Sequence, residues 1–251
     1  MRRYSVAFTN KRELKMATFT VLDGRDPMLM VDLLPGDQVI AESNAMVMSD
    51  GNVSVEGQLQ GGVLSSIARK LFTEETLFQQ VFTADKGRSG QVFLAPQLPG
   101  DIEVVDIGER QFFLNSGCYL ASEATVNTAT KLNSSVLGSF FGSTGGLMVM
   151  RTEGRGKLCL CGFGQVLQVD VKPDEEVVID NGHVVAWDTA LEYRVSTASS
   201  KRGLFGRMMS TAMSGEYLVT RFSGSGKVYI STRNQVAFED YVKSLGGIGA
   251  K

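Results

Sequence analysis

The sequence predicts an all-β protein in which one β unit occurs three times, with short helical inserts and a C-terminal helix. Three observations favour this fold class. The chain of 251 residues contains 28 glycines and only 5 prolines, which suits many tight turns between strands. Apolar and polar residues alternate through many short segments, as they do in half-buried strands. Short motifs also recur in a fixed order, which indicates an internal repeat.

Three glycine turns between alternating segments are the first recurring element. The segments after these turns begin with GQVFLAP at Gly90, GKLCLCG at Gly156 and GKVYIST at Gly226. Each is preceded by another glycine and by an alternating segment such as LFQQVFT at 77–83. Two alternating strands joined by a glycine turn are typical of a β-hairpin. The sequence therefore predicts three equivalent hairpins.

Three nine-residue segments are the second recurring element. They read ESNAMVMSD, NSGCYLASE and DNGHVVAWD, and they align without gaps at 42–50, 115–123 and 180–188. A proline turn with acidic residues precedes each segment. We therefore predict a single domain over residues 1–251 that has an N-terminal β extension and three quasi-equivalent repeats, at 33–97, 98–170 and 171–236.

Helices are predicted inside the repeats and at the end of the chain. Three short apolar segments occupy equivalent places, at 61–72, 134–142 and 201–213. They either cover the ends of the β units or form a surface for an oligomer or a partner. The third is rich in methionine and basic residues, a composition compatible with a partner protein or a membrane surface. The segment 234–247 places Val236, Tyr241 and Leu245 near one face, with Phe238 beside it, which predicts an amphipathic terminal helix.

The third nine-residue segment contains the single histidine, His183, and the single tryptophan, Trp187. His183 aligns with Ala45 and Cys118, so its position accepts residues that share no chemistry. We expect His183 to share a strand face with Val185 and Trp187, partly buried and hydrogen-bonded to the backbone.

An active site is the alternative interpretation of His183, since Asp180 and Asp188 flank it. A carboxylate beside an imidazole is a common general acid–base arrangement. No serine or cysteine nucleophile with an orienting partner is evident in the sequence, however. We therefore assign no catalytic residue.

An acidic residue closes each nine-residue segment, namely Asp50, Glu123 and Asp188. On a pseudo-threefold frame these carboxylates could converge and bind a hard cation. The simpler interpretation is that each acid ends a strand and accepts hydrogen bonds within a turn. We favour the turn and assign no metal site.

Composition excludes several classes of function. The 25 basic and 27 acidic residues nearly balance. The chain therefore has no overall excess of positive charge, which disfavours binding to nucleic acid. The three cysteines, Cys118, Cys159 and Cys161, have no disulfide or metal spacing and indicate reduced thiols in the cytoplasm. The glycine turns lack the Gly-Lys-Ser/Thr sequence of a phosphate loop, so no cofactor is indicated. No secretory signal or transmembrane segment is predicted.

Several quoted motifs resemble one known family. GQVFLAPQLPGDI, NSGCYLAS, IDNGHVVAWD and SGSGKVYISTRN are similar to sequences in the family of altered inheritance of mitochondria protein 24, and the likeness covers roughly residues 28–234. The resemblance implies a fold like that of the tryptophan RNA-binding attenuation protein (TRAP), in which β-rich units form a TRAP-like arrangement. The mitochondrial member is associated with inner-membrane organisation. The family supplies no established catalytic residues to carry over.

Three functions remain open from the sequence. The first is a non-enzymatic scaffold or interaction protein that self-associates, with a trimer favoured by the threefold pattern and with a protein partner still to be identified. The second is an RNA- or small-ligand-binding protein, which rests on analogy with the TRAP-like fold. The third is an enzyme that uses His183 with a nearby aspartate. We expect the scaffold.

Overall fold

The computed structural model describes residues 17–59, 78–130, 149–197 and 218–245. Within them almost every element is a β-strand in an antiparallel sheet, and α3 (Gln235–Leu245) follows the last strand. The predicted all-β fold class with a C-terminal helix is therefore confirmed. The three expected helical inserts, at 61–72, 134–142 and 201–213, lie outside the described residues.

The strands fall into three successive groups of six, which we call units 1, 2 and 3. An additional strand, β1 (Thr18–Leu22), precedes them and pairs with β2. Unit 1 contains β2 (Met28–Leu33), β3 (Gln38–Glu42), β4 (Met46–Ser49), β5 (Val53–Leu59), β6 (Phe78–Ala84) and β7 (Gly90–Leu94). Unit 2 contains β8 (Gly100–Ile107), β9 (Phe112–Asn115), β10 (Tyr119–Glu123), β11 (Val126–Thr130), β12 (Val149–Gly154) and β13 (Gly156–Phe163). Unit 3 contains β14 (Val166–Val171), β15 (Glu176–Asp180), β16 (Val184–Asp188), β17 (Glu192–Thr197), β18 (Leu218–Ser223) and β19 (Gly226–Ser231).

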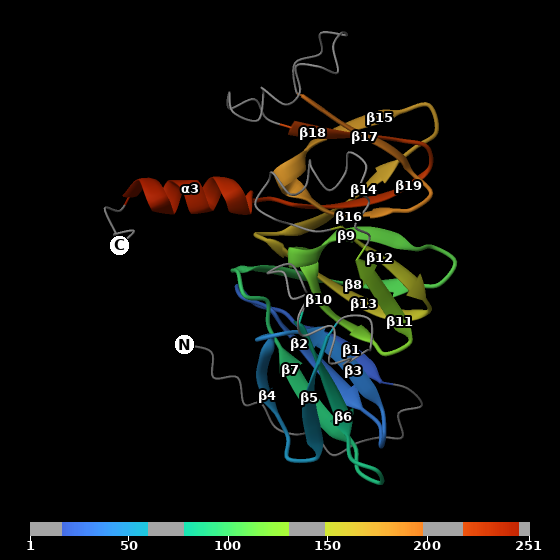
Figure 1. Ribbon diagram of the computed structural model, residues 1–251, viewed down its shortest axis with the longest axis vertical. Coiled ribbons are helices and arrows are strands. Elements are labelled where there is room, and N and C mark those ends of the chain that lie inside the picture. Colours follow the sequence, from blue (N-terminus) through green and yellow to red (C-terminus); the bar gives the residue numbers. More distant parts are fainter. Residues whose placement is uncertain (1–16, 60–77, 131–148, 198–217, 246–251) are drawn as a thin grey trace, which may run out of the picture.

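The sheets are shared between neighbouring units. Their strand orders are β1-β2-β7-β4, β5-β6-β3-β10-β13-β8, β11-β12-β9-β16-β19-β14 and β15-β18-β17. Each six-stranded sheet therefore takes three strands from one unit and three from the next. The units follow one another along the long axis of the molecule, with unit 1 at the bottom and unit 3 at the top of Figure 1.

The glycine turns do not close hairpins, so this prediction was wrong. β6 and β7 flank the first turn but belong to different sheets, and the same holds for β12 and β13 and for β18 and β19. Each turn instead carries the chain from one sheet to another. Gly87, Gly154 and Gly224 have φ values of 94°, 100° and 107° at these turns, in the left-handed region that glycine adopts without a steric penalty.

A β-bulge marks the same position in all three units. The pairing register shifts between Met46 and Met48, between Tyr119 and Ala121, and between Val184 and Ala186. Val47, Leu120 and Val185 lie inside the shifts and are aligned in the nine-residue segments. By sheet partners the units span 28–94, 100–163 and 166–231. Units 1 and 3 thus begin with β2 and β14, which the sequence repeats placed mostly in the N-terminal extension and in the second repeat. Superposition of the three units stays a prediction.

In the described residues the core consists of three apolar clusters that cross unit boundaries. The first joins Leu29 and Phe82 of unit 1 to Leu120 of unit 2. The last contains Trp187, which is fully buried, with its ring centroid 5.6 Å from that of Phe113 in unit 2. Because each cluster draws on two units, the burial of apolar surface that stabilises one unit depends on its neighbour.

Candidate functional site

A pocket of about 190 Å³ lies on one side of the sheets, beside the first residues of α3. All three units contribute to its wall, through the last residues of β3, β9, β13 and β19, the residues that precede β10 and β16, and the residues that follow β7 and β19. The wall includes Glu42, Leu98, Asn115, Cys118, Cys161, Phe163, Asn181, Ser231, Arg233 and Val236. This volume is smaller than the roughly 300–1,000 Å³ that is usual for ligand pockets.

Glu42 is the acidic residue of this pocket. It is the last residue of β3, and burial raises its pKa from the ordinary value of 4.5 to about 7. Removing a carboxylate from water disfavours its charged form, so Glu42 gains a proton near neutral pH. The side chain can therefore act as an acid or a base at physiological pH.

The two thiols of the pocket are poor nucleophiles. Burial, together with a smaller contribution from the nearby Glu42 carboxylate, raises the pKa of Cys118 to about 12. Burial also raises the pKa of Cys161, whose Sγ donates to the carbonyl of Gly117 at 3.8 Å. Only a thiolate reacts readily, so these protonated thiols give Glu42 no nucleophile to activate.

Two buried amides are among the other polar groups of the wall. Asn115 is 3% exposed and its Nδ2 donates to the carbonyl of Val184. Asn181 is 4% exposed and its Oδ1 accepts a hydrogen bond from the Thr220 hydroxyl at 2.7 Å. Among the described residues, Asn115 Oδ1 and Asn181 Nδ2 have no hydrogen-bond partner. Each could still bind a water molecule or a small polar ligand.

His183 lies in a short 3-10 turn, Asn181–His183, immediately before β16. Its Nδ1 is 2.7 Å from the carbonyl oxygen of Ser231, to which it donates, and its side chain is half-buried. This geometry agrees with the expected backbone partner. The expected strand face is wrong, because the 3-10 turn and the bulge at Val185 interrupt the alternation that would align His183 with Trp187.

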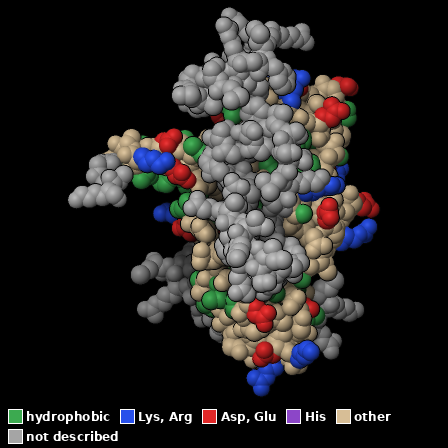
Figure 2. Space-filling model, viewed as in Figure 1, with side chains coloured by type: hydrophobic (Ala, Val, Ile, Leu, Met, Phe, Trp, Pro, Cys, Tyr) green, Lys and Arg blue, Asp and Glu red, His purple; other side chains and the backbone are tan. Residues whose placement is uncertain are grey.

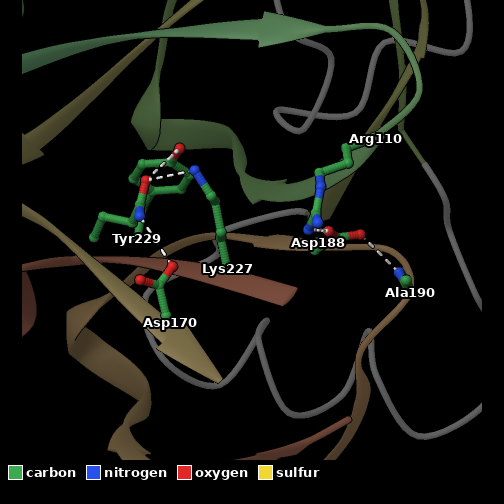
Figure 3. Close-up of polar contacts among 7 residues, drawn as sticks. Arg110, Asp170, Asp188, Ala190, Lys227 and Tyr229 are labelled. Atoms are coloured by element: carbon green, nitrogen blue, oxygen red, sulfur yellow. Dashed lines mark hydrogen bonds and ion pairs between the residues drawn. The ribbon is translucent and has the colours of Figure 1, made fainter. Parts of the chain in front are cut away.

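The flanking aspartates are engaged elsewhere. Asp180 caps the 3-10 turn by accepting a hydrogen bond from the Gly182 amide at 2.8 Å. Asp188 lies at the far end of β16, where it accepts from the Ala190 amide at 2.9 Å and pairs with Arg110 Nη1 at 2.8 Å (Figure 3). The structure thus brings neither carboxylate to His183 through any contact that it records.

The other closing acids accept hydrogen bonds from backbone amides, and only Asp50 accepts one within a turn, from Asn52. Asp50 accepts from the amides of Asn52 at 3.0 Å and Gln91 at 2.9 Å, and Glu123 accepts from the amide of Lys157 at 2.9 Å. Gln91 and Lys157 follow equivalent glycines, so the two acids join equivalent strand ends. Within the described ranges no three His, Cys, Asp or Glu side chains gather closely enough to hold a metal ion. The three closing acids therefore do not converge on one point there.

Sequence reasoning missed Glu42, although a signal was present. Glu42, Asn115 and Asp180 open the three aligned nine-residue segments, and all three are polar. Of these three, the sequence made only Asp180 a candidate, as a neighbour of His183. The opening position becomes interesting because units 1 and 2 bring Glu42 and Asn115 to one pocket.

The chain is similar to known proteins over almost its whole length. A family model described as "Mitochondrial biogenesis AIM24" matches residues 19–233. An uncharacterised protein of Streptococcus pyogenes serotype M6 is 31% identical over 252 residues, which cover 96% of each protein. A crystal structure of a protein from Streptococcus pyogenes is 28% identical, covers 92% of this chain and 100% of that one, and has a TM-score of 0.73. In the described part of this chain, no helix is both long and apolar enough to cross a membrane.

Proposed function

We propose that this chain, which belongs to the mitochondrial biogenesis AIM24 family, is a non-enzymatic scaffold that self-associates. One observation carries the proposal. Most of the exposed large hydrophobic side chains in the described residues lie on α3, on β4 and on β15. Apolar side chains that are grouped at a protein surface commonly mark an interface.

The C-terminal helix supports an interaction role. Phe238, Tyr241, Val242 and Leu245 are 41–68% exposed and follow the spacing of one helical face. Asn234 caps the helix through the amide of Ala237, and the ring of Phe238 packs 5.0 Å from that of Phe163. Figure 2 shows hydrophobic side chains along α3, which projects sideways from the sheets. Among the described residues these contacts hold α3 at its first turn, and the exposed face is available to a protein partner.

The chemistry of the candidate residues supports a role without catalysis. The Cys118 thiol is held protonated, since its pKa is about 12. The imidazole of His183 donates to a carbonyl, and Asp188 is paired with Arg110. An acid–base or nucleophilic mechanism needs such groups in contact with one another. The three thiols are unpaired, which suits the cytoplasm that we propose as the compartment.

Light scattering tests the self-association. We expect a mass above the 27.2 kDa of one chain at micromolar concentrations, falling on dilution. The threefold pattern and the TRAP-like resemblance favour a trimer. A mass of one chain at every concentration would contradict the proposal. A His183→Ala variant that melts like the natural protein, yet reproduces the phenotype of a gene deletion, would contradict the absence of catalysis.

Small-ligand binding is the second candidate function. The pocket offers Asn115 Oδ1 and Asn181 Nδ2 together with the titrating Glu42, and these groups suit a compact polar molecule. The near balance of charge and a pI of about 5.6 disfavour RNA. Native mass spectrometry of the purified protein would detect a retained small molecule, and a high 260/280 nm absorbance ratio would detect nucleic acid. Either finding would favour this candidate over the scaffold.

A further inference from the structure

The chain joins its units twice through the same strand pair. Unit 1 meets unit 2 where β3 pairs antiparallel with β10, and unit 2 meets unit 3 where β9 pairs antiparallel with β16. In the nine-residue alignment β3 corresponds to β9, and β10 corresponds to β16. The register is also the same, since Ala121 opposes Ala41 and the aligned Ala186 opposes Leu114.

Two strands that are equivalent to the junction strands, β4 and β15, lie at sheet edges in the first and the last unit. β4 is the counterpart of β10 and β16, yet in the described residues it pairs only with β7 at the edge of its sheet. β15 is the counterpart of β3 and β9, yet among the strands that the structure describes it pairs only with β18. The two edges lie in unit 1 and unit 3, at opposite ends of the molecule (Figure 1). One copy of the chain thus has two free strand edges, β4 and β15, that correspond to the two strands paired at each internal junction.

Exposure of apolar side chains supports this interpretation. Met46 and Val47 of β4 are 43% and 53% exposed. Their counterparts in β10 and β16, which have a neighbouring unit, are at most 2% exposed: Tyr119, Leu120, Val184 and Val185. On β15, Val178 is 47% exposed. Proteins usually protect a free strand edge with charged residues or a bulge; β4 has a bulge but its sequence, MVMS, carries no charge.

The geometry points to a second copy of this chain as the partner of these edges: β4 of one copy pairs antiparallel with β15 of the next. This inference rests on the proposed self-association and names its interface. In the register of the two internal junctions, Met48 opposes Ile179, Ser49 opposes Val178 and Asp50 opposes Val177. Both internal junctions give this same assignment independently.

Such an interface is head to tail. Each copy supplies β4 to one neighbour and β15 to the other, so the two surfaces in contact are different. A contact of this kind generates a closed ring or an open stack, according to the rotation between copies. It does not generate a twofold dimer in which the same residues face each other. The difference is testable by mixing two variants.

Cysteine cross-linking tests both the pair of strands and the direction. Ser49→Cys and Val178→Cys are made as separate proteins, mixed, allowed to exchange by dilution and reconcentration, and oxidised mildly. Opposed residues of antiparallel strands have Cβ atoms about 4.5–5.5 Å apart, close to the reach of a disulfide. We expect a product of twice 27.2 kDa from the mixture and none from either variant alone. In the matched control, Leu167→Cys is mixed with Ser49→Cys in place of Val178→Cys, because Leu167 on β14 is similarly exposed, at 40%. The unaltered chain controls for cross-linking through its own thiols.

Cross-linking of one variant with itself overturns the inference, because a twofold contact would then unite identical edges. No product from the mixture also overturns it when light scattering shows that the variants still associate. A monomeric natural protein instead overturns the proposed function from which the inference starts. The two failures are thus distinguishable.

A charged side chain on the edge gives a second test. Val178→Lys places a charged side chain in the proposed junction, so we expect light scattering to give the mass of one chain. Leu167→Lys is the control and should keep the mass of the natural protein. An unchanged mass for a folded Val178→Lys variant, judged by circular dichroism and thermal melting, counts against the interface. If that variant fails to fold, the cross-linking experiment still decides.

Discussion

Replacing Glu42 by glutamine tests the electrostatics of the pocket. Burial raises the pKa of Glu42 from 4.5 to about 7 in the folded protein. Between these values the folded chain holds a proton that the unfolded chain has lost, so the free energy of unfolding falls as pH rises. The separation corresponds to about 3 kcal/mol at about 1.4 kcal/mol for each pH unit. Since the carboxyl is partly exposed to water, we expect about 1–2 kcal/mol.

Glutamine keeps the shape of the protonated acid and cannot ionise. Urea unfolding at intervals between pH 4 and pH 8 should therefore show a growing advantage for Glu42→Gln. Below pH 4.5 the difference in unfolding free energy from the natural protein should be constant, and by pH 8 it should shift by about 1–2 kcal/mol in favour of the variant. Glu56→Gln, on the exposed part of β5, is the control and should show no such trend. A difference for Glu42→Gln that stays flat from pH 4 to pH 8 would refute the reasoning.

Three further substitutions probe the frame around the site. His183→Ala removes the hydrogen bond to Ser231 and should cost about 1 kcal/mol in urea unfolding without changing the mass in solution. Trp187→Ala removes a fully buried ring from an aromatic cluster and should cost about 3–5 kcal/mol; a cost below about 1 kcal/mol would mean that the ring contributes little to the core. Gly154→Ala combines a φ of 100° with a Cβ placed 2.2 Å from the carbonyl of Thr125 and should lower the melting temperature, at a cost of about 1–3 kcal/mol. Gly51→Ala, which meets no atom within 4 Å, should melt close to the natural protein.

The sequence predicted local structure better than it predicted strand pairing. Alternation and the nine-residue alignment located the strands, and the apolar spacing located α3. The predicted hairpins failed because a glycine turn between two alternating strands has the same local sequence whether those strands pair or enter different sheets. The pairing of β7 with β2 and β4, instead of with β6, is fixed by packing across many residues. No short window of sequence contains that information.

In the candidate site, too, the sequence predicted local features better than those that depend on tertiary packing. His183 was conspicuous because it is the single histidine, and its backbone partner followed from its expected half-burial. Glu42 was inconspicuous because glutamate is common, and its raised pKa depends on a pocket that all three units build. Its chemistry therefore arises from tertiary burial. Charge and spacing along the chain could not reveal it.

The sharing of sheets between units also has a consequence for synthesis on the ribosome. β3 leaves the ribosome long before its partner β10, since about 80 residues separate the two strands. At about 5–20 residues per second, the inner edge of β3 stays unpaired for on the order of ten seconds. β9 then waits for β16 in the same way. The nascent chain therefore carries an open strand edge through most of translation, and this edge is where a chaperone would have to act to prevent mispairing between neighbouring nascent chains.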